Sequence, residues 1–283
     1  ETVRALGSTG MDLDMSGYDS RTVLHLAAAE GSFKVVELLC ELRANVNAQD
    51  RWGRTPIREA IDNRHDSVAH VLHMYGAQLE VEQPATWMHQ AAATGDLGYM
   101  SMILRYGIHV DAKNYDARSA LHLAAAEGNV RVVEHLISHL ADVNIMDMRG
   151  RKPIDDAIAN QHLHVARLLA ESNSHPDPRR MEAALQDAAA KADVDRLRFL
   201  VDMGVNIDAC DYDRRTAFHV LANTGSISAA AVLIGARADV MKEDRWGLTP
   251  LVPALESNDE TAAMVVQMCG AQLSGEHLEN PVL

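Results

Sequence analysis

Apolar and polar positions between residues 115 and 147 predict two short helices joined by a tight turn. Ser119 stands just ahead of the apolar run LHLAAA, where its hydroxyl can cap the first helix. Gly128 is expected to end that helix, because the left-handed conformation that follows a helix penalises a side chain. Four apolar residues then recur at helical spacing on one face of a second helix: Val132, Val133, Leu136 and Ile137.

The same pattern recurs with a shift of 97 residues, as YDSRTVLHLAAAEG from Tyr18, YDARSALHLAAAEG from Tyr115 and YDRRTAFHVLANTG from Tyr212. A second motif keeps this shift: DRWGRTPI from Asp50, DMRGRKPI from Asp147 and DRWGLTPL from Asp244. Within one block, His25, Arg58 and His89 occupy equivalent places, 33 and 31 residues apart. The basic unit therefore has close to 33 residues, and three units make one block.

Units of this length cannot bury enough apolar surface alone, so they are expected to stack around a shared core. We expect an all-α solenoid of helix-turn-helix units with β-hairpin loops, about eight repeats in three blocks of 97 residues. The expected repeats are 18–50, 51–81, 82–114, 115–147, 148–178, 179–211, 212–244 and 245–275, with a partial repeat at 1–17 and a tail at 276–283. Small side chains at Ala27, Ala28, Ala124 and Ala125 let the inner helices approach closely, and Leu123 is expected in the core.

These motifs carry a family resemblance. RTVLHLAAAEG, RSALHLAAAEG and DRWGRTPI resemble the ankyrin signature with its Thr-Pro-Leu-His turn, and VVELL, VVEHL, ANVN and ADVN resemble its second half. The alternation of the two motifs is similar to the ankyrin segment of kidney-type glutaminases and, more loosely, to those of plant ankyrin kinases and potassium channels. The resemblance implies a regulatory or assembly segment whose partner lies on a concave face built from hairpin tips and inner helices.

The composition of the chain excludes several classes of function. A formal net charge of -14 argues against non-specific binding to nucleic acid or to an anionic membrane. No apolar run approaches the roughly 18 residues of a membrane-spanning helix, so no direct membrane insertion is expected. Three widely spaced cysteines, Cys40, Cys210 and Cys269, give neither metal-ligand spacing nor a disulfide framework, which favours a reducing compartment. The chain is predicted to be cytoplasmic.

Two repeats depart from the pattern, because those containing Met88 and Leu185 lack the Asp-x-x-Gly turn. Prolines there make a regular hairpin doubtful: Pro84, Pro176 and Pro178. The segment 171–180 is expected to be a looser joint between the second and third blocks. At the other end of the chain, MDLDMSGYD aligns with IHVDAKNYD, so the sequence is expected to open inside a preceding repeat and to come from a longer protein.

Motifs for catalysis and cofactor binding are missing from the sequence, including Gly-x-Ser-x-Gly, the Walker A loop and the Ser-x-x-Lys pair of glutaminases. We therefore predict no enzyme activity and no cofactor. His25, His122 and His219 occupy the signature position, where the ring is expected to tie adjacent turns together by hydrogen bonds. Two further pairs, His135 with His139 and His162 with His164, could bind a transition metal, but a solvated outer face is the favoured interpretation and no metal is predicted.

The hairpin tips are the better candidates for a binding surface, because Tyr, Trp and Arg most often carry interface energy. The predicted protein-binding residues are Tyr18, Arg51, Trp52, Tyr115, Arg149, Tyr212, Arg245 and Trp246. A motif present in every block can equally be an internal ladder, with Arg pairing to Asp and the aromatic rings packing on the next tip. That structural interpretation is the favoured one.

Two functions remain open. The first is a regulatory or assembly domain of a larger intracellular protein, in which the partner is another domain of the same polypeptide. The second is a stand-alone adaptor that binds a separate protein partner. A metal- or ligand-sensing solenoid is a weaker alternative that depends on the paired histidines.

Overall fold

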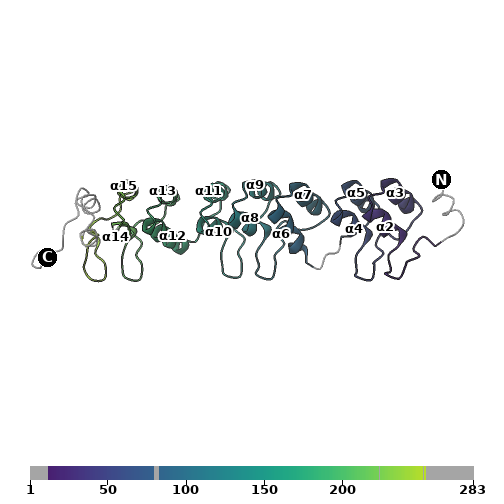
Figure 1. The fold of residues 1–283 in the computed structure, drawn as a ribbon, viewed down its shortest axis with the longest axis horizontal. Helices are drawn as coiled ribbons and strands as arrows, with labels where there is room; N and C mark the ends of the chain where they lie inside the picture. Colours follow the sequence, from purple (N-terminus) through teal and green to yellow (C-terminus); the bar gives the residue numbers. More distant parts are fainter. Residues whose placement is uncertain (1–11, 80–82, 223, 251, 253–283) are drawn as a thin grey trace, which may run out of the picture. The chain divides into compact units, whose positions relative to one another are not determined.

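The computed structural model describes residues 12–79, 83–222, 224–250 and 252. Within these ranges the chain forms seven pairs of helices (Figure 1). The pairs are α2 (Val23–Ala29) with α3 (Phe33–Glu41), α4 (Pro56–Asp62) with α5 (Asp66–Met74), α6 (Pro84–Thr94) with α7 (Leu97–Arg105), α8 (Ala120–Glu127) with α9 (Val130–Ser138), α10 (Pro153–Ala159) with α11 (Leu163–Glu171), α12 (Pro178–Ala190) with α13 (Val194–Asp202), and α14 (Ala217–Ala222) with α15 (Ile227–Gly235). The expected all-α architecture of two-helix repeats is confirmed.

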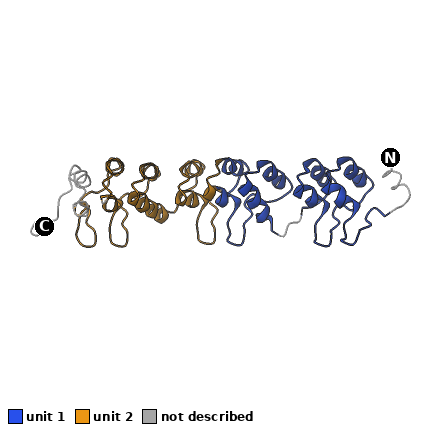
Figure 2. Cartoon of the chain, in the orientation of Figure 1, with its two compact units in different colours: residues 1–124, 131–142 blue, residues 125–130, 143–283 orange. Residues whose placement is uncertain are grey.

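The chain divides into two compact units (Figure 2). Unit 1 comprises residues 1–124 and 131–142, and unit 2 comprises residues 125–130 and 143–283. The helices expected in the eighth repeat, the tail at 276–283, Cys269 and most of the partial repeat at 1–17 lie outside the described residues.

Local signals explain where the helices begin and end. The Thr22 hydroxyl caps α2 by accepting the backbone N–H of His25, and the His25 ring in turn accepts the N–H of Thr22. Gly31 and Gly128 follow α2 and α8 with φ of 72° and 73°, a conformation that glycine adopts without strain. The predicted end of the first helix at Gly128 is confirmed.

The inner helices pack closely on small side chains. All four alanines expected there are buried: Ala27, Ala28, Ala124 and Ala125. The expectation for Leu123 is wrong, because this residue is only half-buried while Leu121 is fully buried. The buried stripe of α8 runs through Leu121, Ala124 and Ala125, and Leu123 points away from it. On α9, Val132, Val133 and Leu136 are buried as predicted and Ile137 is half-buried.

The loops between repeats are tight turns rather than extended ladders. The only paired bridges in the described ranges join Ser16 with Thr22 and Cys210 with Thr216. Six turns, here called tips, are each closed by a backbone N–H to carbonyl bond across five residues: 17–21, 50–54, 114–118, 147–151, 211–215 and 244–248. The expected β-hairpins are therefore very short.

The two proline-containing segments begin long inner helices. Pro84 and Pro178 occupy the first turn of α6 and α12, which have 11 and 13 residues. The joint at 171–180 is not loose. Ser174 donates its hydroxyl to the Val143 carbonyl at 3.0 Å, and the Asp177 N–H donates to the Asp155 carboxylate at 2.9 Å. Side-chain bonds to the preceding repeat replace the missing tip.

Candidate protein-binding surface

Five of the six tips are shaped by the side chain at their first position, whereas the tip at 17–21 begins with Gly17. In the tip at 244–248, the Asp244 carboxylate accepts the backbone N–H groups of Trp246 at 2.8 Å and Leu248 at 2.9 Å. The same pair of bonds recurs at Asp50, Asn114, Asp147 and Asp211. An acidic or amide side chain here mimics a turn of backbone, so the residues that follow are held outward.

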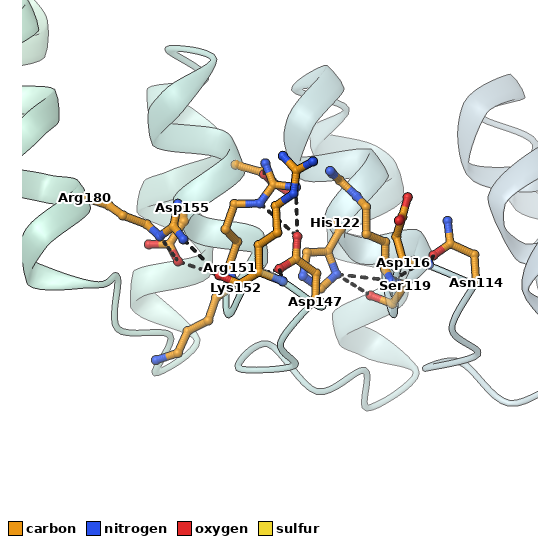
Figure 3. A network of polar contacts seen from close by, with 12 residues as sticks. Asn114, Asp116, Ser119, His122, Asp147, Arg151, Lys152, Asp155 and Arg180 are labelled. Carbon is orange, nitrogen blue, oxygen red and sulfur yellow. Dashed lines mark hydrogen bonds and ion pairs between the residues drawn. The ribbon is translucent and has the colours of Figure 1, made fainter.

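The signature histidines fasten the tips to the helices. The Nδ1 atom of His25 accepts the N–H of Thr22, so its Nε2–H donates to the Arg54 carbonyl of the next tip at 2.9 Å. His219 makes the equivalent bond to the Leu248 carbonyl at 3.1 Å, and its burial lowers the pKa of its ring. His122 bonds with Ser119 as His25 does with Thr22 (Figure 3). The predicted role of tying adjacent turns together is confirmed for His25 and His219.

In unit 1 the structure brings Tyr18, Arg51 and Trp52 together on neighbouring tips. The Arg51 guanidinium donates to the Asp19 carboxylate at 2.7 Å and lies 4.7 Å from the centre of the Trp52 ring. The Tyr18 ring centre lies 5.8 Å from the same guanidinium. Despite these contacts the Tyr18 side chain is 97 % exposed and Trp52 is 55 % exposed. Arginine and aspartate therefore form an internal ladder, and Tyr18 and Trp52 keep more than half of their surface exposed.

Unit 2 repeats the arginine–aspartate pair and the arginine–tryptophan contact 194 residues later. Arg245 donates to the Asp213 carboxylate at 2.6 Å and lies 4.8 Å from the centre of the Trp246 ring. Tyr212 is 94 % exposed and Trp246 is 58 % exposed. The backbone N–H of Arg245 also donates to the Asp213 carbonyl at 2.9 Å, as Arg51 does to Asp19. Each unit thus presents one cluster of the same composition, called here a Tyr-Arg-Trp cluster.

The other two predicted residues stand outside these clusters. Tyr115 is on a tip of unit 1 and is 88 % exposed. Arg149 is on a tip of unit 2, where its N–H donates to the Asp147 carboxylate and its carbonyl accepts from Arg180. Met148 takes the place that Arg51 and Arg245 have in the two clusters and is exposed. Residue 148 therefore cannot form the arginine–aspartate pair that Arg51 and Arg245 form.

A charged pocket in unit 2 was missed by the sequence analysis. It has a volume of about 330 Å³ and lies among α10, α12 and α13. Figure 3 shows the Arg180 guanidinium facing Asp155 and the Arg151 guanidinium on Asp147 beside it. Burial raises the pKa of Asp147, but the N–H groups of Arg151 and Arg149 and the Arg151 guanidinium outweigh it, so this pKa lies below its usual value. Comparing the blocks could have found the pocket, because Trp87 and Tyr99 become Ala184 and Arg196 after a 97-residue shift.

His135 and His139 have hydrogen-bond partners within the protein. His135 shares a hydrogen bond with the Ser101 hydroxyl at 3.0 Å, and His139 bonds to the His135 carbonyl at 2.9 Å. His162 lies against Gly128, where an added Cβ would stand 2.5 Å from its Nδ1. Among the residues that the structure describes, no three His, Cys, Asp or Glu side chains gather as metal ligands would. Likewise, no helix in the described ranges has the length and hydropathy needed to span a membrane.

Comparison with known proteins identifies the repeats. A family model described as ankyrin repeats, three copies, matches residues 1–83 and 86–180, and a second ankyrin-repeat model matches residues 185–234. The potassium channel SKOR of Arabidopsis thaliana is 38 % identical over 168 residues, which are 59 % of this chain and 20 % of the channel. The Arabidopsis channel GORK is 33 % identical over 205 residues, covering 72 % of this chain and 25 % of the channel.

Relatives with enzyme names match over shorter stretches. A putative glutaminase 2 of Caenorhabditis elegans is 44 % identical over 72 residues, 25 % of this chain and 12 % of that protein. Among solved structures, a chain from the complex of the Bd0816 predatory endopeptidase of Bdellovibrio bacteriovorus with the immunity protein Bd3460 superposes with a TM-score of 0.52. It is 20 % identical and covers 64 % of this chain and 97 % of its own length, so the likeness concerns the fold alone.

Proposed function

The chain belongs to the ankyrin-repeat family, and from this premise we propose that it is a non-catalytic protein-protein interaction scaffold, a regulatory or assembly domain of a larger intracellular protein. The observation that carries this proposal is the pair of Tyr-Arg-Trp clusters. Each holds a large aromatic ring in a fixed place while leaving more than half of it in water. Such rings contribute strongly to interfaces because they offer much area at little entropic cost.

The clusters are suited to protein recognition rather than to chemistry. Arg51 and Arg245 are neutralised by Asp19 and Asp213, so each cluster presents a flat ring and a paired charge. The aspartate ladder holds the guanidinium against the ring before any partner arrives, which lowers the entropy lost on binding. Tyr115 in unit 1 and Arg149 in unit 2 are further exposed tip residues with the same proposed role.

Attachment to a larger protein is favoured over a stand-alone adaptor by the relatives. The matched segments are 20 % and 25 % of the channels SKOR and GORK, and 12 % of the putative glutaminase. Ankyrin segments in these relatives thus form minor parts of much longer chains. The complete open reading frame decides between the two functions, because an additional catalytic or membrane domain in the same chain supports the first.

The binding role is tested by selecting peptides from a displayed random library on the immobilised 283-residue chain. Dissociation constants of the selected peptides are then measured by calorimetry for the wild type and for the Trp52→Ala and Trp246→Ala variants. We expect each substitution to weaken binding by more than about 1 kcal/mol, as for an interface hot spot, with little change in melting temperature.

Matched controls are Met74→Ala in unit 1 and Ile227→Ala in unit 2, which remove exposed apolar side chains elsewhere than the tips. These are expected to leave the affinity unchanged. A lower melting temperature with unaltered affinity for the tryptophan variants would assign the rings to the internal ladder and refute their binding role.

A further inference from the structure

The pocket among α10, α12 and α13, here called the α10–α12 pocket, has both charged and apolar walls. Its lining residues are Arg151, Asp155, Asp156, Ile158, Ala159, Arg180, Ala183, Ala184, Asp187 and Arg196. All of them belong to unit 2. Ala183 and Ala184 are the small side chains that leave a volume of about 330 Å³ open.

The carboxylates of this pocket already have donors. Both oxygens of Asp155 accept backbone N–H groups, from Lys152 at 2.9 Å and from Asp177 at 2.9 Å. Asp187 accepts from the Lys191 ammonium and from the Arg196 guanidinium, which together hold the pKa of its carboxyl below the usual value. Further donors from a ligand are not needed to satisfy these acids.

The arginines, in contrast, have donors left over. Arg196 is only 3 % exposed and gives one N–H to Asp187 at 2.5 Å and another to the Ile158 carbonyl at 3.4 Å. Its Nε–H is buried and has no acceptor in the part of the chain that the structure describes. The buried Nε of Arg180 lies 3.9 Å from Asp155 and 3.7 Å from Asp177, beyond hydrogen-bond distance.

A buried, cationic N–H without an acceptor is costly, and it is satisfied best by an anionic oxygen. We propose that the α10–α12 pocket receives a carboxylate side chain of a partner protein, whose oxygens accept the Nε–H groups of Arg180 and Arg196. The apolar surface of Ala183 and Ala184 lies beside the methylenes of that side chain, which favours glutamate over aspartate. This inference rests on the proposed function, since the carboxylate belongs to a bound protein.

The equivalent place in unit 1 supplies the natural control. After a 97-residue shift, Ala184 corresponds to Trp87 and Arg180 to Gln83. Trp87 is buried there, with Tyr99 6.3 Å away between ring centres and the Arg58 guanidinium 5.6 Å above it. The repeat framework therefore accepts Trp and Gln at these positions, so Ala184→Trp and Arg180→Gln alter the pocket with side chains that the fold already uses.

The test follows the arginine Nε–H signals of the full ¹⁵N-labelled chain by NMR. The probe is N-acetyl-L-glutamate N-methylamide, and the controls are the matching glutamine and alanine compounds. We expect the glutamate probe to shift the Arg180 and Arg196 signals saturably, with at least about tenfold weaker binding to the Ala184→Trp and Arg180→Gln variants. Unmoved signals, equal binding of the glutamine probe, or undiminished binding to Ala184→Trp would each overturn the proposal.

The peptide selection separates this failure from failure of the proposed function. One outcome is that the selected peptides lose affinity for the Trp52→Ala and Trp246→Ala variants but bind Ala184→Trp as tightly as the wild type. That result would support the scaffold function and refute the carboxylate pocket. Selected peptides that share a glutamate and lose at least about tenfold in affinity for Ala184→Trp would support both.

Discussion

Repeat 3 of unit 1 and repeat 6 of unit 2 occupy the same place in the 97-residue block, yet their inner faces are built from different chemistry. In repeat 3, Trp87 and Tyr99 pack with their ring centres 6.3 Å apart, and the Arg58 guanidinium from α4 lies 5.6 Å from the centre of the Trp87 ring. In repeat 6, Ala184 and Arg196 stand at these positions and leave a charged pocket beside α10. Both repeats lack the Asp-x-x-Gly turn motif.

The difference teaches how a repeat array can acquire a pocket. Exchanging one large buried ring for alanine opens a volume, and exchanging the second ring for arginine places cationic donors at its wall. The surrounding helices keep their lengths to within one turn, with 11 residues in α6 and 13 in α12. Stability in such arrays is a sum of local terms, so one repeat can change without disturbing distant ones.

The largest expected effect comes from Trp87→Ala in unit 1. Removing this buried ring leaves a cavity beside Tyr99 and Arg58, and we expect a loss of about 3–5 kcal/mol in the free energy of unfolding. Urea denaturation monitored by circular dichroism measures this loss. Ala184→Trp in unit 2 enters an open pocket and is expected to change stability by less than about 1.5 kcal/mol. Equal losses for the two variants would show that the two repeats do not differ in packing.

The sequence predicted the parts of this molecule that depend on local pattern. Repeat length, helix pairs, the signature histidines and the close packing at Ala124 and Ala125 all follow from motif and periodicity. The choice between Leu121 and Leu123 did not, because it depends on how α8 is turned toward its neighbours. The candidate site shows the same limit of sequence-based prediction. The motif around Tyr18 was compatible with an internal ladder and with an exposed ring. In the structure the ladder is formed by Arg51 and Asp19.

The α10–α12 pocket could not be predicted from one repeat alone. Arg196 occupies a helix in a polar-looking stretch, VDRLRFLVD, and nothing local indicates that its side chain is buried. Burial follows from the small residue at Ala184 and from the Ile158 carbonyl, which is 38 residues away in the sequence. Only the alignment of whole blocks, in which two aromatic residues are exchanged, carries that signal.

A smaller effect is expected for Arg196→Ala. The substitution removes a buried side chain and its bonds to Asp187 and the Ile158 carbonyl, and we expect a loss of about 2 kcal/mol in the free energy of unfolding. The loss stays below that of a fully buried ion pair because Asp187 is partly exposed and keeps Lys191. Arg196→Met retains the volume and is expected to cost less than about 1.5 kcal/mol. Equal costs for both would mean that the charge, and not packing, holds α13 in place.

The smallest expected effect is a difference in the pH dependence of stability between Asp187 in repeat 6 and Asp62, which lies beside repeat 3. Hydrogen bonds from Lys191 and Arg196 hold the folded-state pKa of Asp187 below its usual value of 3.8, so its stabilisation is present above pH 3.8 and is lost as the pH falls through the lower folded value. Asp187→Asn should therefore lower stability near neutral pH by less than about 1 kcal/mol, because solvent screens this partly exposed pair, and the difference should vanish in acid.

Asp62 in unit 1 has the opposite sign. Burial raises its folded-state pKa above 3.8, against the lowering effect of Arg58, so the charged form costs stability above that pH and the cost disappears as the pH falls. Asp62→Asn is then expected to match or exceed the wild type in stability at neutral pH, and the two should converge in acid. Urea titrations of both variants at a series of pH values measure the two differences. If both variants became less stable than the wild type to the same extent as the pH rose, Asp187 and Asp62 would not differ in the sign of their contribution, and the contrast would be wrong.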